Sequence, residues 1–375
     1  MVWRTKGNAL MLAVKGRFRD HVAFCAGTTN LQANAALHHW VNEQLPSLNI
    51  SCCGPLTLTP LAGDAGFRNY YRLNTEPSLI AVDAPPTTEK NEVFVSLASL
   101  LREHGVHAPS VLATDYDRGF LLQEDLGDQQ LLGLLNTDSV DALYGEVLTD
   151  LLRIQQINTK TLDLPHYDQP LLRQEMDLFS DWFVPQLLGH TLTEPEIALI
   201  EHTFAQLEAL AAEQPKVLVH RDFHSRNLMI RDGLAPGIVD FQDGVVGPLT
   251  YDLVSLLRDC YIRWPQERVE RWALAYGNMA VEVGLMRPVT RETFLRWFDW
   301  MGLQRHIKVL GIFSRLHLRD GKDGYLQDLP LVLRYTLEIA SSYSELLPFA
   351  DWIKTTLVPL AKQQDWYRDY RSAGN

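Results

Sequence analysis

The spacing of hydrophobic residues changes once along this chain, and that change limits the possible folds more than any other feature. Between residues 56 and 122, short segments typical of β-strands alternate with turns that contain Gly, Pro and Asp. The predicted strands cover residues 56–58, 67–73, 79–83, 110–115 and 119–122. Helical spacing appears from Leu31 to Pro46 and again over residues 87–104. The first third of the chain therefore predicts a small sheet accompanied by helices.

Helical spacing dominates after a polar segment at residues 123–129, where we place a hinge. The predicted helices cover residues 139–158, 171–188, 194–213, 250–262, 291–313 and 330–346, and short strands are expected only at residues 216–220, 228–231 and 237–240. We expect an α+β fold with a small lobe at residues 31–124 and a larger, mainly helical lobe at residues 125–375. Residues 1–30 are basic and we interpret them as a poorly constrained N-terminal extension.

The charge balance of the chain narrows its possible partners. Lys and Arg number 34 against 46 Asp and Glu, which gives a formal net charge of -12. Nucleic acids and anionic membranes select clustered positive charge, so neither is an expected partner, and no apolar run reaches the ~18 residues that span a bilayer. Cys25, Cys52, Cys53 and Cys260 lack the spacing of a disulfide framework or a metal site. A cytoplasmic protein that binds small molecules is expected, either as a monomer or as a homo-oligomer.

The densest group of ionisable residues is the segment His-Arg-Asp-Phe-His-Ser-Arg-Asn at residues 220–227. Predicted strands flank this segment, and the strand that follows them ends at Asp240. Phosphoryl transfer uses one carboxylate to orient and deprotonate the attacking hydroxyl, and amide and carboxylate oxygens to hold magnesium against a triphosphate. Asp222, Asn227 and Asp240 are residues of these types. The motif therefore points to transfer of a phosphoryl group.

These segments resemble the catalytic and metal-binding loops of the aminoglycoside phosphotransferase and choline kinase-like family. The resemblance extends from about residue 31 to the C-terminus and includes the acidic segment Pro-Leu-Thr-Tyr-Asp-Leu at residues 248–253. It implies a protein kinase-like bilobal fold, with a small antiparallel sheet and helix in the N-lobe and a larger helical C-lobe. It further implies that ATP and Mg²⁺ are used, that Asp222 is the catalytic base, and that Asn227 and Asp240 bind the metal.

By the same resemblance, a turn between two predicted strands is expected to cover the nucleotide, and it consists of Gly63, Asp64, Ala65, Gly66, Phe67 and Arg68. Backbone groups near Glu124 and Leu126 are expected to contact adenine. One departure concerns the third strand, residues 79–83, which lacks the lysine that holds the α- and β-phosphates in related kinases. Arg68, Arg72 and Lys90 are the candidate replacements.

The absent lysine narrows the resemblance to one subfamily. The segments at residues 64–72, 82–86, 220–229, 240–243, 259–265 and 300–313 resemble the bacterial anomeric kinases of N-acetylmuramate and N-acetylglucosamine, whose third strand also ends in Asp. This resemblance implies phosphorylation of the C1 hydroxyl of these sugars in peptidoglycan recycling.

Sugar recognition requires aromatic faces and planar polar groups, and a lactyl carboxylate requires a cation. The candidate substrate residues are His224, Asp243, Arg263, Trp264 and Arg305. Four of them have a structural alternative: hydrogen bonding to loop backbone for His224, bracing of the loop for Asp243, core packing for Trp264 and a surface position for Arg305. Two other functions also remain open. One is phosphorylation of an aminoglycoside, and the other is nucleotide binding without catalysis, which the absent lysine suggests.

Overall fold

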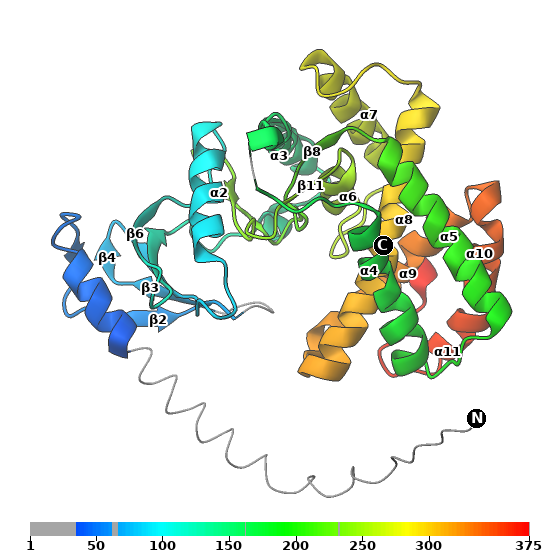
Figure 1. Cartoon of the computed structure of the whole chain (residues 1–375), viewed down its shortest axis with the longest axis horizontal. Coiled ribbons are helices and arrows are strands. Elements are labelled where there is room, and N and C mark those ends of the chain that lie inside the picture. Colours follow the sequence, from blue (N-terminus) through cyan, green and yellow to red (C-terminus); the bar gives the residue numbers. More distant parts are fainter. Residues whose placement is uncertain (1–34, 62–66, 162, 232, 375) are drawn as a thin grey trace, which may run out of the picture. The chain divides into compact units, whose positions relative to one another are not determined.

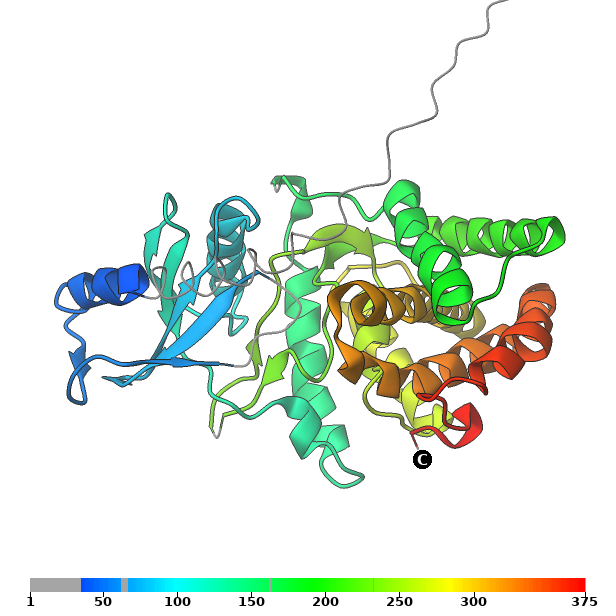
Figure 2. The same ribbon diagram turned by 90° about the horizontal axis from the view of Figure 1, so that it is seen from below.

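The computed structural model describes residues 35–61, 67–161, 163–231 and 233–374. These residues form two compact units (Figures 1 and 2). The first unit contains the described residues up to Asn91 together with Val111–Asp125, and the second contains Glu92–Ser110 together with the described residues from Leu126 onward. The helix α2 (Asn91–Glu103) thus belongs almost entirely to the second unit, although the last strands of the first unit follow it in sequence.

The first unit is built on an antiparallel five-stranded sheet. Its strand order is β2-β3-β5-β7-β6, and the strands are β2 (Leu58–Pro60), β3 (Asn69–Leu73), β5 (Leu79–Asp83), β6 (Val111–Asp115) and β7 (Phe120–Glu124). In the register of β3 and β5, Asn69 lies opposite Asp83 and Arg72 lies opposite Ile80. A separate ribbon pairs β1 (Ser51–Cys52) with β4 (Thr75–Glu76).

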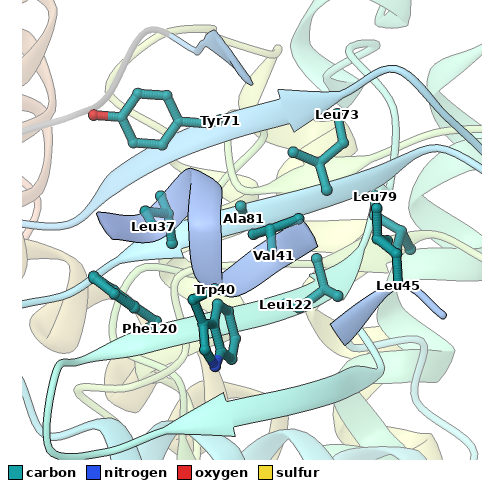
Figure 3. Packing of buried hydrophobic residues seen from close by; sticks show 10 residues of the cluster. All are labelled: Leu37, Trp40, Val41, Leu45, Tyr71, Leu73, Leu79, Ala81, Phe120 and Leu122. Atoms are coloured by element: carbon teal, nitrogen blue, oxygen red, sulfur yellow. The ribbon is translucent and has the colours of Figure 1, made fainter. Parts of the chain in front are cut away.

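A helix at residues 35–44 packs on this sheet and forms the core of the first unit (Figure 3). Helical spacing puts Leu37, Trp40 and Val41 on one face of the helix, and all three are buried. This face meets side chains from β3, β5 and β7, and the rings of Trp40 and Phe120 lie 5.7 Å apart. Burial of the whole apolar face explains why so short a helix is stable here.

The second unit is mainly helical. Its principal helices are α2 (Asn91–Glu103), α3 (Val140–Gln155), α4 (Gln169–Leu178), α5 (Glu194–Glu213), α6 (Tyr251–Leu257), α7 (Gln266–Glu282), α8 (Arg291–Asp320), α9 (Leu329–Ala340), α10 (Leu347–Trp352) and α11 (Val358–Ala361). Two antiparallel ribbons accompany them and pair β8 (Lys216–Val219) with β11 (Val245–Pro248), and β9 (Leu228–Met229) with β10 (Gly237–Ile238). The helices α4, α5, α6, α7 and α9 all contact α8, which runs through the unit (Figure 2).

The helix α8 has well-defined ends and an unusually polar buried centre. The Thr290 hydroxyl accepts a hydrogen bond from the Thr293 backbone N–H at its start, and Gly321 has a φ of 68° at its end. Between residues 300 and 311, every residue is buried, including Arg305 and Lys308. Charged groups buried on all sides require partners, because leaving them unpaired is very costly. Their partners lie in the candidate site.

Close packing at Gly311 gives a testable prediction about the second unit. A Cβ atom at Gly311 would lie 2.3 Å from the carbonyl carbon of Leu178 and 2.5 Å from the nitrogen of Phe179. Because these are backbone atoms, Gly311→Ala is expected to lower the free energy of unfolding by about 1–3 kcal/mol, measured by denaturant titration. Gly145→Ala is the control, because Gly145 lies in α3 with nothing within 4 Å of the position that a Cβ atom would take, and alanine favours helices. Equal stability of the two variants would contradict the close approach at Gly311.

The expected α+β, bilobal organisation is confirmed, although several boundaries differ from the predicted ones. The third predicted strand coincides with β5, and the helix predicted at residues 194–213 coincides with α5. The helix predicted at residues 171–188 divides into α4 and a π-helical segment, η3 (Phe179–Leu187), and α7 was not predicted. Among the described residues, no helix has both the length and the apolar character needed to cross a membrane.

Candidate active site

The loop at residues 220–227 joins β8 to β9, and its first residues are anchored to α6. Asp252, in the first turn of α6, accepts hydrogen bonds from the backbone N–H of His220 at 2.6 Å and of Arg221 at 3.0 Å. Burial raises the pKa of the Asp252 carboxyl to about 7, against the lowering effect of these two hydrogen bonds. One buried side chain therefore holds two consecutive peptide groups at the start of the loop.

His220 connects the loop to the segment after β10, which carries Asp240. Its Nε2 lies 3.0 Å from the carbonyl oxygen of Val239, and its Nδ1 lies 3.3 Å from the backbone nitrogen of Asp222. These two contacts require a neutral ring that donates from Nε2 and accepts at Nδ1. Burial lowers the pKa of His220 to about 4, which agrees with the neutral form. His220 thus has the structural role of fixing loop backbone.

Asp222, Asn227 and Asp240 come together as the sequence motif predicts. The side-chain nitrogen of Asn227 donates to the carbonyl oxygen of Asp222 at 3.0 Å and to a carboxylate oxygen of Asp240 at 3.1 Å. Asn227 is buried, whereas Asp240 is exposed and Asp222 is half-buried. The asparagine therefore links the two carboxylate-bearing segments and leaves both carboxylates accessible.

Backbone strain is concentrated at the same place. Among the described residues, the non-glycine residues with a positive φ are Asn49, Arg221 and Asp240, with φ values of 56°, 79° and 66°. This left-handed region is unfavourable for residues with a Cβ atom, and such residues often occur at functional sites. Arg221 directly precedes Asp222, and Asp240 carries one of the candidate metal-binding carboxylates. Contacts with the surrounding residues therefore hold the backbone at these two positions in a conformation that it would not adopt alone.

The charges around Asp222 keep its carboxyl ionised. Burial opposes ionisation, but Lys308 and Arg305 of α8, followed by His224 and Arg221, outweigh it and lower the pKa of Asp222 to about 2. Nη2 of Arg305 lies 3.9 Å from Oδ1 of Asp222. At neutral pH, Asp222 is thus a carboxylate that can accept a hydrogen bond from a hydroxyl group.

The donor set of Asn227 and Asp240 fits a magnesium ion. Both hydrogens of the Asn227 amide are used as donors, so its oxygen is the atom that can face a cation, and Asp240 offers an exposed carboxylate. Mg²⁺ prefers such oxygen ligands and usually keeps water and phosphate oxygens in its other positions. In the part of the chain that the structure describes, no group of three or more His, Cys, Asp or Glu is placed to hold a metal.

The two arginines predicted to contact the nucleotide each have a carboxylate partner in the first unit. Arg68 is buried and its Nε lies 2.9 Å from Glu89. Arg72, in β3, makes a two-pronged contact with Asp125 at 2.6 and 2.9 Å, and Ser78 donates to the same carboxylate at 2.7 Å. Hydrogen bonds to carboxylates therefore hold both guanidinium groups in fixed positions, through two parallel bonds for Arg72 and through Nε for Arg68.

The other predicted nucleotide contacts are placed as follows. Gly63, Asp64, Ala65 and Gly66 lie outside the described residues. Phe67 is 66% exposed. Glu124 ends β7 opposite Leu79, and Leu126 is buried in the second unit, where a Cβ atom on Gly237 would lie 3.0 Å from its side chain.

Three of the predicted substrate residues lie in or near the 220–227 loop. His224 is part of the loop, Asp243 is in the turn after Asp240, and Arg305 is on α8. His224 lies edge-on to the ring of Tyr261 with 5.4 Å between centroids, and the Arg226 guanidinium lies 3.5 Å from the centre of the same ring. Asp243 is exposed, three residues after Asp240. Arg305 is buried and contacts the loop directly through Asp222.

Arg263 and Trp264 have other contacts. Arg263 forms an ion pair with Glu338 of α9 at 3.0 Å. Trp264 is buried, donates from its indole N–H to the Tyr144 hydroxyl at 3.1 Å, and lies edge-on to Trp272. The contacts of Trp264 are those of a core aromatic residue, which was the structural alternative for this position.

Glu175 is a residue of this site that the sequence analysis did not select. It lies on α4, is 6% exposed and forms ion pairs with Arg221 of the loop and Lys308 of α8. The only local signal is its position on the apolar face of its helix, between the buried residues Leu172 and Met176. A carboxylate at such a position needs a buried partner, but the sequence does not indicate which one.

Comparison with known proteins places this geometry in a family. The chain matches the model described as the phosphotransferase enzyme family over residues 57–289. It is 41% identical over 319 residues to the N-acetylmuramate/N-acetylglucosamine kinase of Pseudomonas putida, covering 84% of this chain and 94% of the relative. It is 38% identical over 324 residues to the protein of the same name from Neisseria meningitidis, covering 85% and 94%.

Solved structures support the fold. An ADP-bound aminoglycoside phosphotransferase superposes with a TM-score of 0.54 at 17% identity, covering 81% of this chain and 98% of the other. An ethanolamine kinase from Plasmodium vivax also gives a TM-score of 0.54, at 11% identity, covering 76% and 82%. These likenesses confirm the kinase-like fold. Since the family model matches more than half of the chain and relatives above 30% identity match most of it, the chain belongs to the phosphotransferase enzyme family, in the group of N-acetylmuramate/N-acetylglucosamine kinases.

Proposed function

We propose that this phosphotransferase transfers the γ-phosphoryl group of ATP to the anomeric C1 hydroxyl of N-acetylmuramate and N-acetylglucosamine. The observation that carries the proposal is that Asn227 links the backbone carbonyl of Asp222 to the Asp240 carboxylate, while nearby cations keep the Asp222 carboxyl ionised. The names of relatives at 38–41% identity support the choice of amino sugar as the acceptor. Because both sugars are components of peptidoglycan, the enzyme is proposed to act in peptidoglycan recycling in the cytoplasm.

Each residue of the candidate site has its own proposed role in the reaction. Asp222 accepts a hydrogen bond from the C1 hydroxyl, orients the hydroxyl oxygen toward the γ-phosphorus and takes the proton as the new O–P bond forms and the bond from the γ-phosphorus to the departing ADP breaks. Asn227 and Asp240 would hold Mg²⁺, which supplies positive charge to the phosphate oxygens when bound. Arg305 holds the Asp222 segment in place, at 3.9 Å from its carboxylate.

The phosphates of the nucleotide need further cations, because the third strand carries no lysine. We propose that Arg68 and Arg72 take this role. Their anchoring by Glu89 and Asp125 supports the proposal, since a guanidinium group fixed in advance loses little freedom on binding. Phe67 and the turn before it, together with backbone near Glu124 and Leu126, remain the proposed contacts of the nucleotide.

The test is a product analysis. Incubation with ATP, Mg²⁺ and either amino sugar should yield an acid-labile sugar 1-phosphate whose phosphorus couples to H1 in NMR spectra. A parallel panel of kanamycin-type aminoglycosides should show no turnover. Phosphate found only at another hydroxyl would overturn the anomeric assignment, and turnover of aminoglycosides alone would favour the other family activity. ATP binding without transfer to any acceptor would instead indicate a non-catalytic protein.

A further inference from the structure

A buried ion pair lies behind the loop, and neither of its members is assigned to the reaction. Nζ of Lys308, on α8, lies 2.9 Å from Oε1 of Glu175, on α4, and the two side chains are 5% and 7% exposed. Glu175 also accepts hydrogen bonds from the Tyr167 hydroxyl and the Arg221 guanidinium. Burial disfavours the charged form of Glu175, but Lys308 and Arg221 outweigh it and lower the pKa of this carboxyl. The carboxylate is thus fully engaged inside the second unit.

Two chains of contacts lead from this pair to a single loop residue. In the first, Glu175 binds the side chain of Arg221 directly. In the second, Lys308 donates to the Tyr251 hydroxyl at 3.0 Å, and Arg305 donates to the same hydroxyl at 3.2 Å and to the Arg221 carbonyl oxygen at 2.9 Å. Both therefore end on Arg221, the residue immediately before Asp222.

Arg221 is the residue that needs such support. Its φ of 79° is unfavourable for an L-amino acid with a side chain, and only surrounding contacts can maintain it. Its N–H is held by Asp252, its carbonyl by Arg305 and its side chain by Glu175. Release of one of these contacts allows the peptide unit between Arg221 and Asp222 to rotate, which moves the Asp222 carboxylate.

Stability does not account for the pair. Buried ion pairs add little net stability, because the loss of hydration offsets most of the attraction between the charges. A well-packed apolar pair would serve equally well as core. The contacts of Glu175 and Lys308 instead coincide with the one strained backbone position next to Asp222.

We propose that Glu175 and Lys308 are positioning residues for phosphoryl transfer, which act through Arg221 and Arg305 to hold the backbone that presents Asp222. This inference rests on the proposed role of Asp222. It predicts an effect on the chemical step rather than on substrate binding, because both residues are buried and their contacts are with each other, with the buried Tyr167 and Tyr251 and with the half-buried Arg221.

The experiment compares Glu175→Gln, Lys308→Met and the double variant with wild type in steady-state kinetics and thermal melting. Each single variant should lower kcat by about 10- to 100-fold, with KM values for ATP and acceptor within about twofold of wild type, because small displacements of a reacting group are costly. The double variant should melt above Glu175→Gln, because it no longer buries the charge of Lys308 without the opposite charge of Glu175. Its kcat should stay low. Recovery of kcat together with melting temperature would show a merely structural pair.

Glu208→Gln is the matched control. Glu208 is buried and pairs at 2.6 Å with Arg173, which lies on the same helix as Glu175. This variant should lose stability and keep kcat. A kcat for Glu175→Gln within twofold of this control would overturn the proposal. If Lys308→Met does not fold, Lys308→Arg replaces it, and the retained cation should keep kcat within about threefold of wild type.

A second comparison separates this proposal from the proposed function. In single-turnover assays, Glu175→Gln in an Asp222→Asn background should reduce the residual rate no further, because Glu175 is inferred to act only through Asp222. A further tenfold loss would show an independent role. All rates are measured with the acceptor that wild type phosphorylates, or as ATP hydrolysis if it phosphorylates none. A wrong sugar assignment therefore leaves the positioning test intact.

Discussion

Replacement of Asp222 by Asn is expected to lower kcat by about 10²- to 10⁴-fold, the range typical of losing a positioned acid–base group. Asparagine keeps the shape of the side chain but cannot take a proton from the attacking hydroxyl. The backbone carbonyl that Asn227 binds is unchanged by the substitution, so the loop should keep its conformation. The substitution also removes the negative charge beside Arg305 without leaving that arginine unpartnered, because Arg305 still donates to Arg221 and Tyr251.

The measurement is kcat from the sugar kinase assay, together with the thermal shift produced by Mg·ADP. We expect the shift for Asp222→Asn to equal that of wild type, since nucleotide binding does not use this carboxylate. Asp117→Asn is the control for the same chemical change, because Asp117 is exposed in the turn between β6 and β7. A kcat near the wild-type value would remove Asp222 from the role of base.

Replacement of Asp240 by Asn should have the second largest effect, with kcat about 10²- to 10³-fold lower at the magnesium concentration that saturates wild type. Asp240 provides the charged member of the proposed magnesium site, and a neutral amide oxygen attracts the cation far less. The substitution should leave the main-chain conformation unchanged, because asparagine tolerates the φ of 66° as well as aspartate does. The loss should therefore come from the charge.

This prediction has a readout besides activity. Thermal stabilisation by ADP in the presence of Mg²⁺ should shrink in Asp240→Asn, whereas stabilisation by ADP with a chelator should match wild type. Raising the magnesium concentration should restore part of the Mg·ADP shift. If both shifts remain as in wild type, Asp240 does not hold the metal.

The proximity of the three proposed reactive residues could be predicted from sequence because their placement is local. Asp222 and Asn227 lie in one short loop between apolar strands, and Asp240 lies two residues after β10, which pairs with the strand after the loop. Short antiparallel ribbons bring such ends together with little dependence on the rest of the chain. The contacts of Asn227 with both segments are the result.

The supporting charges could not be predicted in the same way. Glu175 and Lys308 are separated by more than a hundred residues, and only the packing of α4 against α8 makes them neighbours. Arg305 was selected as a substrate residue, but its hydrogen bonds are with the Arg221 carbonyl and the Tyr251 hydroxyl. Helical periodicity shows which face is apolar, and it does not show which buried charges meet across two helices.

The fold itself shows the same division. A short apolar run followed by two prolines placed β5, and helical periodicity placed α5, because these elements depend on their own residues. The central part of α8 is buried on every side, so the sequence there has no amphipathic periodicity from which the length of the helix or the role of its polar residues could be predicted. The sequence by itself determined that a strand-rich part precedes a mainly helical one and that the 220–227 loop carries the residue types of a phosphoryl-transfer site. Tertiary structure decided where the buried cations lie and why Arg221 can hold a left-handed backbone, because both depend on contacts between segments that are distant in the chain.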